Sequence, residues 1–198
     1  MSADELLSAP AAPAPLHAKF TMSYFKKMQG RSYEENTSLL GTFDTVEQFW
    51  LLYVHLRRPI DERPNMCDYH LFRQGIKPMW EDQANVNGGK WIVRLKKGLA
   101  ARYWENVLLA ILGAAFPVGE DEICGAVLSI RYQEDILSVW NRSADSRRTC
   151  MQIRDTLREV MELPQTATME YKKHTDSMRD NSSYRNTQSH YPSNGEGK

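Results

Sequence analysis

One short stretch of the chain places an indole and a carboxylate side by side, directly before a turn. Trp80 and Glu81 are adjacent, and the polar segment 82–89 that follows them ends in Asn-Gly-Gly. Glycine and asparagine tolerate positive φ, so this segment predicts a turn. A strand-like run comes next, in which side-chain alternation places Lys90 and Arg94 on one face. An indole, an acid and two cations thus gather around one predicted hairpin, a combination that suits a positively charged, phosphorylated aromatic ligand.

The sequence contains no second cluster of side chains with an obvious reactive pattern. Residues 67–70, Cys-Asp-Tyr-His, have the spacing of half a zinc site, but no second Cys/His pair accompanies them. His70 and His174 are isolated, and neither a Ser/His/Asp arrangement nor a phosphate-binding glycine loop is present. We therefore expect a binding protein rather than an enzyme, with no metal and no cofactor.

Composition narrows the class of protein further. Lys and Arg number 25, as do Asp and Glu, so the formal net charge is zero, which argues against bulk, sequence-independent nucleic-acid binding. The three cysteines are odd in number and widely spaced, which is typical of a reducing compartment. The longest apolar run, 107–118, is too short to span a bilayer, and the start lacks the pattern of a signal peptide. We expect a cytoplasmic protein without a membrane association.

Hydrophobic periodicity predicts one domain between two tails. An Ala/Pro-rich tail over 1–15 and a polar tail over 177–198 are expected to be disordered, leaving a domain over 16–176. Thr45 and Gln48 fit a capping box that opens a helix ending near Arg58. The predicted helices cover 45–58, 99–112 and 147–163, and the predicted strands cover 16–25, 38–43, 67–72, 91–95, 123–132, 136–140 and 168–171. This pattern indicates an α/β or α+β domain.

Several motifs along the chain together resemble the translation initiation factor 4E family. They are Gly41-Thr42-Phe43, the VEQFW of 46–50, Leu71-Phe72, the GIKPMWED of 75–82, the GGKW of 88–91, the CGAV of 124–127 and Trp140. The SYE of 32–34, the KPMWED of 77–82 and the RYWEN of 102–106 look closest to the 4E-homologous branch. The resemblance covers about residues 15–178. It implies a cup-shaped fold, a curved antiparallel sheet backed by three helices, that binds the 7-methylguanosine cap of messenger RNA on its concave side.

The resemblance also implies a role for each candidate residue of the site. Trp80 and Tyr33 match the two positions that stack on the base, and the delocalised positive charge of 7-methylguanine favours two flanking π faces. Glu81 would accept from the N1–H and the exocyclic amine of guanine. Trp140 matches the residue beside the N7-methyl group. The cations expected to meet the phosphates are Lys90, Arg131 and, as a third candidate, Arg94.

The chain departs from the family pattern at positions that bear on these roles. Ile136 and Gln133 stand where the main branch has phosphate-binding lysines, which implies reduced phosphate affinity. Ser23 stands where a tryptophan is expected in the first strand, after Met22, and His-Pro-Leu appears as Ala-Pro-Leu over 14–16. The loss of a buried indole would cost about 3 kcal/mol unless neighbouring side chains fill the space.

A second candidate site concerns protein partners. Trp50 has the spacing of a core residue in its helix, yet the resemblance places it on the convex face. There, with Val46, Asn106 and Leu109, it would receive a helical Tyr-x-x-x-x-Leu-hydrophobic peptide of a scaffold or repressor protein. The protein itself is expected to be a monomer.

These observations leave several functions open. The leading hypothesis is a cap-binding protein that represses translation by competing with the main cap-binding factor. The first alternative is an ordinary initiation factor that recruits the scaffold and promotes ribosome loading, which differs only in its preference among helical partners. Two further alternatives are a protein-interaction adaptor with weak or no cap binding and a cap hydrolase, for which no catalytic residues are evident.

Overall fold

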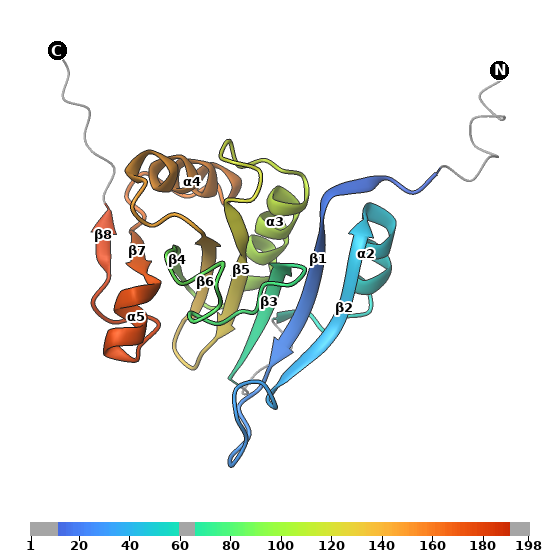
Figure 1. The fold of residues 1–198 in the computed structure, drawn as a ribbon, viewed down its shortest axis with the longest axis horizontal. Helices are drawn as coiled ribbons and strands as arrows, with labels where there is room; N and C mark the ends of the chain where they lie inside the picture. The colour runs from blue at the N-terminus through green and yellow to red at the C-terminus, as the bar shows by residue number, and fades with distance from the viewer. Residues whose placement is uncertain (1–11, 60–65, 191–198) are drawn as a thin grey trace.

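The computed structural model describes residues 12–59 and 66–190 and shows one eight-stranded sheet (Figure 1). The strand order is β2-β1-β3-β5-β6-β4-β7-β8, and every neighbouring pair is antiparallel. The strands are β1 (Pro15–Phe25), β2 (Thr37–Thr45), β3 (Cys67–Arg73), β4 (Gly89–Leu95), β5 (Ile123–Ile130), β6 (Asp135–Asn141), β7 (Met169–Lys173) and β8 (Gln188–His190).

Helices α2, α3 and α4 cover one face of this sheet through a single large hydrophobic core. Alternate residues of the central strands, such as Trp91 in β4 and Leu128 in β5, are fully buried in that core beside Trp104 of α3. The helices are α2 (Val46–Tyr53), α3 (Ala100–Leu112), α4 (Arg147–Val160) and the short α5 (His174–Asp180). The curved antiparallel sheet backed by three helices, predicted from the resemblance, is confirmed.

The start of α2 follows from its sequence. The Thr45 hydroxyl accepts a hydrogen bond from the backbone N–H of Gln48 at 3.3 Å, and the Gln48 amide oxygen accepts from the backbone N–H of Asp44 at 3.0 Å. The helix ends at Tyr53 rather than near Arg58. The following turns are tighter, with the N–H of Leu56 bonded to the carbonyl of Tyr53, and a proline at 59 disfavours helix for the residue before it.

Two expectations about chain organisation are wrong. The segment before β4 does not form a hairpin with it, because 74–88 is a loop and β4 pairs with β6 and β7 instead. The C-terminal segment from Ser177 to residue 190 is ordered rather than disordered: it completes α5, turns, and adds β8 to the sheet edge. In Figure 1, α5 lies beside β7, at the end of the sheet away from α2. Residues 1–11 and 191–198 of the two predicted tails lie outside the described residues.

The missing tryptophan of the first strand leaves no gap in the core. Met22 is fully buried in the core, in the same face of β1 as Phe20. Ser23 points to the opposite face, where its hydroxyl is 3.1 Å from Nδ1 of His70. The substitution therefore replaces a large apolar side chain with a hydrogen-bonding one on the face of the sheet that the three helices leave open.

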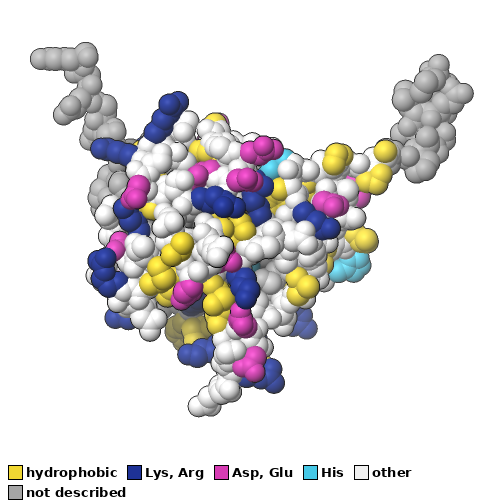
Figure 2. All heavy atoms as spheres, viewed as in Figure 1, with side chains coloured by type: hydrophobic (Ala, Val, Ile, Leu, Met, Phe, Trp, Pro, Cys, Tyr) yellow, Lys and Arg dark blue, Asp and Glu magenta, His cyan; other side chains and the backbone are white. Residues whose placement is uncertain are grey.

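The surface is mixed in charge, as the composition predicts. Figure 2 shows acidic and basic side chains interspersed over the face in view. None of the helices in the described ranges is long and apolar enough to cross a membrane. No group of three His, Cys, Asp or Glu side chains in those ranges is placed to hold a metal ion.

Candidate functional site

A cavity of about 250 Å³ lies on the sheet face opposite helices α2, α3 and α4. The strand residues that line it alternate with core residues, as Asp68 and His70 of β3 do with Tyr69 and Leu71. Six of the seven residues predicted for the site line this cavity, and only Arg94 does not. The lining residues are Tyr33, Asp68, His70, Pro78, Met79, Trp80, Glu81, Lys90, Val127, Ser129, Arg131, Ser138, Trp140, Ser183 and Tyr184.

The loop 74–88 holds Trp80 and Glu81 at the mouth of the cavity. Its anchor is Asn85, which is completely buried and donates hydrogen bonds to the carbonyls of Lys77 and Met79 at 2.9 and 2.7 Å. The half-buried indole of Trp80 packs against a small apolar cluster that includes Trp140. The loop is therefore fixed by internal hydrogen bonds, and the exposed Glu81 carboxylate is presented on a rigid support.

The second aromatic wall comes from the loop between β1 and β2. The Tyr33 ring stacks on Phe25, with centroids 4.7 Å apart, and its hydroxyl donates to the carbonyl oxygen of Pro78 at 3.2 Å. An ion pair of 2.8 Å between Lys77 and Glu34 also joins the two loops. Burial raises the pKa of Tyr33 well above its ordinary value, so the hydroxyl remains a donor.

A buried histidine lies beneath Tyr33. His70 is 1% exposed, and burial lowers its pKa to about 4, so the ring is neutral at pH 7. Its Nε2 is 3.5 Å from the Tyr33 hydroxyl, whose own proton goes to Pro78. Nε2 therefore carries the ring hydrogen, and Nδ1 accepts from Ser23. This chain of hydrogen bonds connects the first strand to the aromatic wall.

Lys90 lies at the centre of the aromatic side chains. Its ammonium group is 5.7, 5.2 and 5.3 Å from the ring centroids of Trp80, Trp140 and Tyr184. The side chain is 2% exposed, and burial, followed by the charge of Lys172, lowers the pKa of Lys90 to about 7. A phosphate group that reached this amine would favour its charged form.

The second cation of the cavity is already paired. The Arg131 guanidinium is 2.6 Å from Asp68 and donates to the carbonyl oxygen of Cys67 at 3.1 Å. Both Arg131 and Asp68 line the cavity. A phosphate that binds Arg131 would have to share the guanidinium with this carboxylate, which sets the orientation of its free N–H groups.

Trp140 forms the inner wall beside these cations. Its indole N–H donates to the Ser138 hydroxyl at 3.2 Å, and its ring lies edge-on to Phe72 with centroids 5.4 Å apart. The centroid of the His174 ring is 4.2 Å from that of the Trp140 ring. These contacts hold the indole in one orientation, with its face toward Lys90.

Comparison with known proteins identifies the family of the chain. Residues 15–189 match the family described as Eukaryotic initiation factor 4E. Eukaryotic translation initiation factor 4E-4 of Caenorhabditis elegans is 52% identical over 176 residues, which cover 87% of this chain and 82% of that protein. The chain belongs to the eukaryotic initiation factor 4E family.

Two further members of the 4E family extend this comparison. Eukaryotic translation initiation factor 4E of Homo sapiens is 34% identical over 167 residues, which cover 82% of this chain and 76% of that protein. A solved complex of C. elegans eIF4E-3 with the 4E-binding protein Mextli and a cap analog superposes with a TM-score of 0.81 at 35% identity, covering 89% of this chain and 99% of that one.

Arg94 takes a different place from the one the family resemblance suggests. Its guanidinium is ion-paired with Glu134 at 2.6 Å and with Glu170 at 3.1 Å, and it donates to the carbonyl oxygen of Tyr184 at 3.2 Å. It shares a strand face with Lys90, as predicted, but it does not line the cavity. Two carboxylates satisfy this cation, so the structure assigns it to holding the C-terminal segment rather than to the cavity.

Ile136 and Gln133, which replace phosphate-binding lysines of the main 4E branch, both lie outside the cavity. Ile136 is 4% exposed and pairs with Arg94 in the sheet, and Gln133 lies in the exposed turn between β5 and β6. The cations that line the cavity within the described residues are Lys90 and Arg131.

Sequence reasoning missed part of the site. Ser183 and Tyr184 line the cavity although the sequence predicts disorder there, and Asp68 and His70 were not assigned to the site. For Tyr184, a lone aromatic side chain in a polar stretch, periodicity gives no signal. The alternation within β3 could have placed Asp68 and His70 together on the face that carries the site.

The predicted partner surface is exposed on the helical side of the 4E fold. Trp50 is 38% exposed, and Val46 and Leu109 are similarly accessible at 37% and 42%. Phe49, by contrast, is buried in the core, so the ambiguity about Trp50 resolves in favour of the surface. The Asn106 side chain is already hydrogen-bonded within the protein: its amide donates to the carbonyl oxygen of Val160 at 3.1 Å and joins α3 to α4.

Proposed function

We propose that this protein binds the 7-methylguanosine cap of messenger RNA in the cavity and regulates translation initiation. The observation that carries the proposal is the convergence of Trp80, Tyr33 and Glu81 with Lys90 and Arg131 on one cavity. The solved relative that superposes on this chain is described as a complex with a cap analog, which supports the same ligand.

The aromatic walls would recognise the methylated base by its charge. Methylation at N7 leaves guanine with a delocalised positive charge, and a cation over an aromatic face is worth about 0.5–2 kcal/mol. A methylated base stacked between Trp80 and Tyr33 would gain this cation–π free energy from each ring, whereas unmethylated guanine carries no such charge. The selectivity for the methyl group is therefore a property of the two rings.

Glu81 would select guanine among the bases. Its exposed carboxylate is free of an ion pair among the described residues, and it can accept from the N1–H and the amine of guanine together. Such a charge-assisted pair of hydrogen bonds is about twice as strong as a neutral one. Adenine presents no matching pair of donors on that edge.

We propose further that the protein acts as a repressor that occupies the cap. Its identity to C. elegans 4E-4 is 52%, against 34% to human 4E, and only two cations line the cavity in the described ranges. These features support a variant branch with weaker phosphate contacts than the main factor. An ordinary initiation factor would use the same cavity, and the difference lies in which helical partner binds Trp50 and Val46.

Trp fluorescence titration tests the cap proposal. Quenching by 7-methyl-GTP should occur at a concentration at least about tenfold lower than quenching by GTP. Trp80→Ala should strongly reduce this preference without loss of the folded state. Glu81→Gln should weaken the binding of both nucleotides and keep the preference, because the base edge that it reads is the same in both. Glu159→Gln, at an exposed acid of α4, serves as the matched control. Equal quenching by both nucleotides would refute the proposal.

A peptide pull-down tests the repressor role. The protein should capture a repressor peptide with the Tyr-x-x-x-x-Leu-hydrophobic pattern in preference to the corresponding scaffold peptide. It should also inhibit translation of a capped reporter mRNA in a lysate and spare an uncapped one. Strong preference for the scaffold peptide would instead support the ordinary initiation factor.

A further inference from the structure

The C-terminal segment between α5 and β8 places an aromatic side chain inside the cavity. Tyr184 lies near the middle of this segment, 181–187, and lines the cavity together with Ser183. Its hydroxyl forms a hydrogen bond of 2.7 Å with the Ser129 hydroxyl on β5. The Tyr184 side chain therefore extends from the segment at the sheet edge to β5, an interior strand of the sheet.

Tyr184 lines the same cavity as its two cations, Lys90 and Arg131. The Lys90 ammonium group is 5.3 Å from the centre of the Tyr184 ring. Ser129, which holds the hydroxyl, lies two residues before Arg131 in the chain, and all four side chains line the same cavity. A phosphorylated tail that contacted both Lys90 and Arg131 would have to share this space with the ring.

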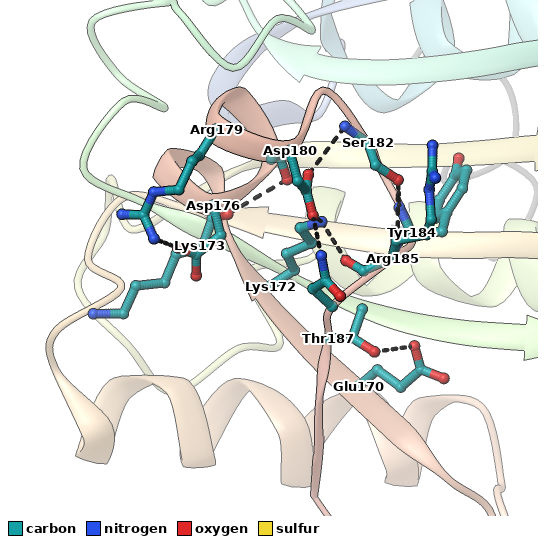
Figure 3. A network of polar contacts seen from close by, with 12 residues as sticks. Glu170, Lys172, Lys173, Asp176, Arg179, Asp180, Ser182, Tyr184, Arg185 and Thr187 are labelled. Atoms are coloured by element: carbon teal, nitrogen blue, oxygen red, sulfur yellow. Dashed lines mark hydrogen bonds and ion pairs between the residues drawn. The ribbon is translucent and has the colours of Figure 1, made fainter.

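The segment is held by a buried ion pair rather than by an apolar core. The Lys172 side chain is completely buried, and its ammonium group is 2.7 Å from Asp180 and also bonds the carbonyl oxygen of Arg185. Asp180 in turn accepts from the Asn186 amide at 3.0 Å and from the backbone N–H of Ser182 at 3.1 Å (Figure 3).

A second set of contacts holds the segment from the other side. Arg94 donates to the carbonyl oxygen of Tyr184 at 3.2 Å, and the Thr187 hydroxyl donates to Glu170 at 2.8 Å. These contacts act together with the Lys172–Asp180 pair, whose loss would leave a completely buried ammonium group without its carboxylate. The side chain of Tyr184 is thus held in place beside Lys90.

We infer that Tyr184 is a specificity-determining residue of the cavity, whose ring covers Lys90 and so reduces what a phosphorylated tail adds to binding. The inference rests on the proposed function, because it concerns the phosphate end of the same ligand. The ring and a phosphate compete for the same ammonium group. Removal of the ring should leave the base contacts of Trp80 and Glu81 unchanged.

Calorimetric titration of the full chain tests this role with matched ligands. The quantity to compare is the ratio of the Kd of 7-methylguanosine to the Kd of 7-methyl-GTP, which isolates the contribution of the phosphates. Tyr184→Ala should raise this ratio about five- to tenfold, the amount expected when a ring over a cation is removed. Tyr184→Phe, which keeps the ring and loses the bond to Ser129, should raise it less.

Two controls separate this effect from a loss of structure. Tyr132→Ala removes a tyrosine that is 85% exposed and lines no part of the cavity, and it should leave the ratio unchanged. Thr187→Val removes the hydrogen bond from the segment to Glu170, changes no charge near Lys90 and lines no part of the cavity, and it should raise the ratio in the same direction. The Kd of 7-methylguanosine should stay within about twofold in Tyr184→Ala, which also reports that the base site remains folded.

The outcomes are distinct for the inference and for the proposed function. A ratio that is unchanged or lowered in Tyr184→Ala would overturn the inference, since the ring would then be a wall that ligands contact. Equal tightening of nucleoside and nucleotide would overturn it too, because the ring would then exclude the base. Equal Kd values for 7-methyl-GTP and GTP in the unmodified protein would contradict the proposed function, while the ratio of guanosine to GTP would still test Tyr184.

Discussion

The hydroxyl of Tyr33 donates a hydrogen bond to the carbonyl oxygen of Pro78, 3.2 Å away, and ties the loop of one aromatic wall to the loop of the other. Pro78 precedes Trp80 by two residues, and Asn85 holds the same loop from within. The spacing between the two rings is thus set before a ligand arrives, which reduces the ordering cost of binding. A tryptophan at position 33 would lack this hydroxyl.

Removal of that hydroxyl should therefore weaken ligand binding while the ring remains. Tyr33→Phe should raise the Kd of 7-methyl-GTP roughly two- to tenfold, the equivalent of one lost hydrogen bond of about 0.5–1.5 kcal/mol. Calorimetry gives the Kd, and Tyr132→Ala controls for the loss of an exposed tyrosine. An unchanged Kd would show that the bond to Pro78 does not organise the cavity.

Arg131 should act on the phosphates and not on the base. Arg131→Gln should weaken binding of 7-methyl-GTP about ten- to a hundredfold, because a charged hydrogen bond is worth about 1.5–3 kcal/mol. Binding of 7-methylguanosine should change less than about twofold, and the salt dependence of 7-methyl-GTP binding should decrease. Equal loss for both ligands would place the role of Arg131 in its ion pair with Asp68 instead.

Binding should depend on pH through Lys90. Burial lowers the pKa of this amine to about 7, so a phosphate meets a charged amine below that pH and an increasingly neutral one above it. The Kd of 7-methyl-GTP should rise between about pH 7 and pH 9 in the unmodified protein.

The control for this pH effect is Lys90→Arg, whose guanidinium stays charged throughout. Because 7-methylguanine itself loses a proton as the pH rises, the informative quantity is the difference between the two pH profiles. The profile of Lys90→Arg should be flatter, and identical profiles would show that Lys90 does not meet the phosphates.

Acid should destabilise the fold through His70. Burial lowers its pKa to about 4, so in the window from about pH 6.5 to pH 4 the unfolded chain binds a proton that the folded chain does not. The stability contributed by the neutral ring is present above this window and is lost as the pH falls through it, by about 3 kcal/mol.

A substitution isolates this contribution. In His70→Gln the free energy of unfolding, measured with urea at pH 7 and pH 4.5, should fall less with acid than in the unmodified protein. His55→Gln, at an exposed site on the other face, should behave as the unmodified protein does. An equal acid dependence in His70→Gln would contradict the burial of a neutral histidine.

The partner surface should be separable from the cavity. Trp50→Ala should weaken binding of a helical Tyr-x-x-x-x-Leu peptide by about 2 kcal/mol or more, roughly thirtyfold, because a half-exposed indole is a typical anchor. Leu51→Ala, at a neighbouring residue that is 69% exposed, is the matched control. The affinity for 7-methyl-GTP should be the same in both variants, and loss of cap binding in Trp50→Ala would indicate a damaged core.

The sequence predicts those features that depend on local periodicity and on adjacency. Strand alternation places Lys90 opposite Trp91, and the Thr45 cap locates the start of α2, because both follow from neighbours within a few residues. The predicted strands 123–132 and 136–140 form neighbouring strands β5 and β6, with the loop between them at 131–134. Trp80 and Glu81 share the cavity for the same reason, since one rigid loop carries both.

Features that depend on distant contacts could not be predicted in this way. β4 pairs with β6 and β7 rather than with the chain before it, because residues 74–88 form a loop that Asn85 holds with its own hydrogen bonds. Arg94 does not line the cavity because its guanidinium is ion-paired with Glu134 and Glu170, which lie 40 and 76 residues further along the chain. Tyr184 is ordered by the buried pair Lys172–Asp180, and polar contacts of this kind leave no hydrophobic pattern.

Calorimetric titration of the unmodified chain with 7-methyl-GTP and with GTP, at one pH and one salt concentration, tests the central claim most directly. Two aromatic faces around a charged base predict a Kd for 7-methyl-GTP at least about tenfold lower than that for GTP. Equal Kd values would contradict the claim that Tyr33 and Trp80 hold the methylated base between them.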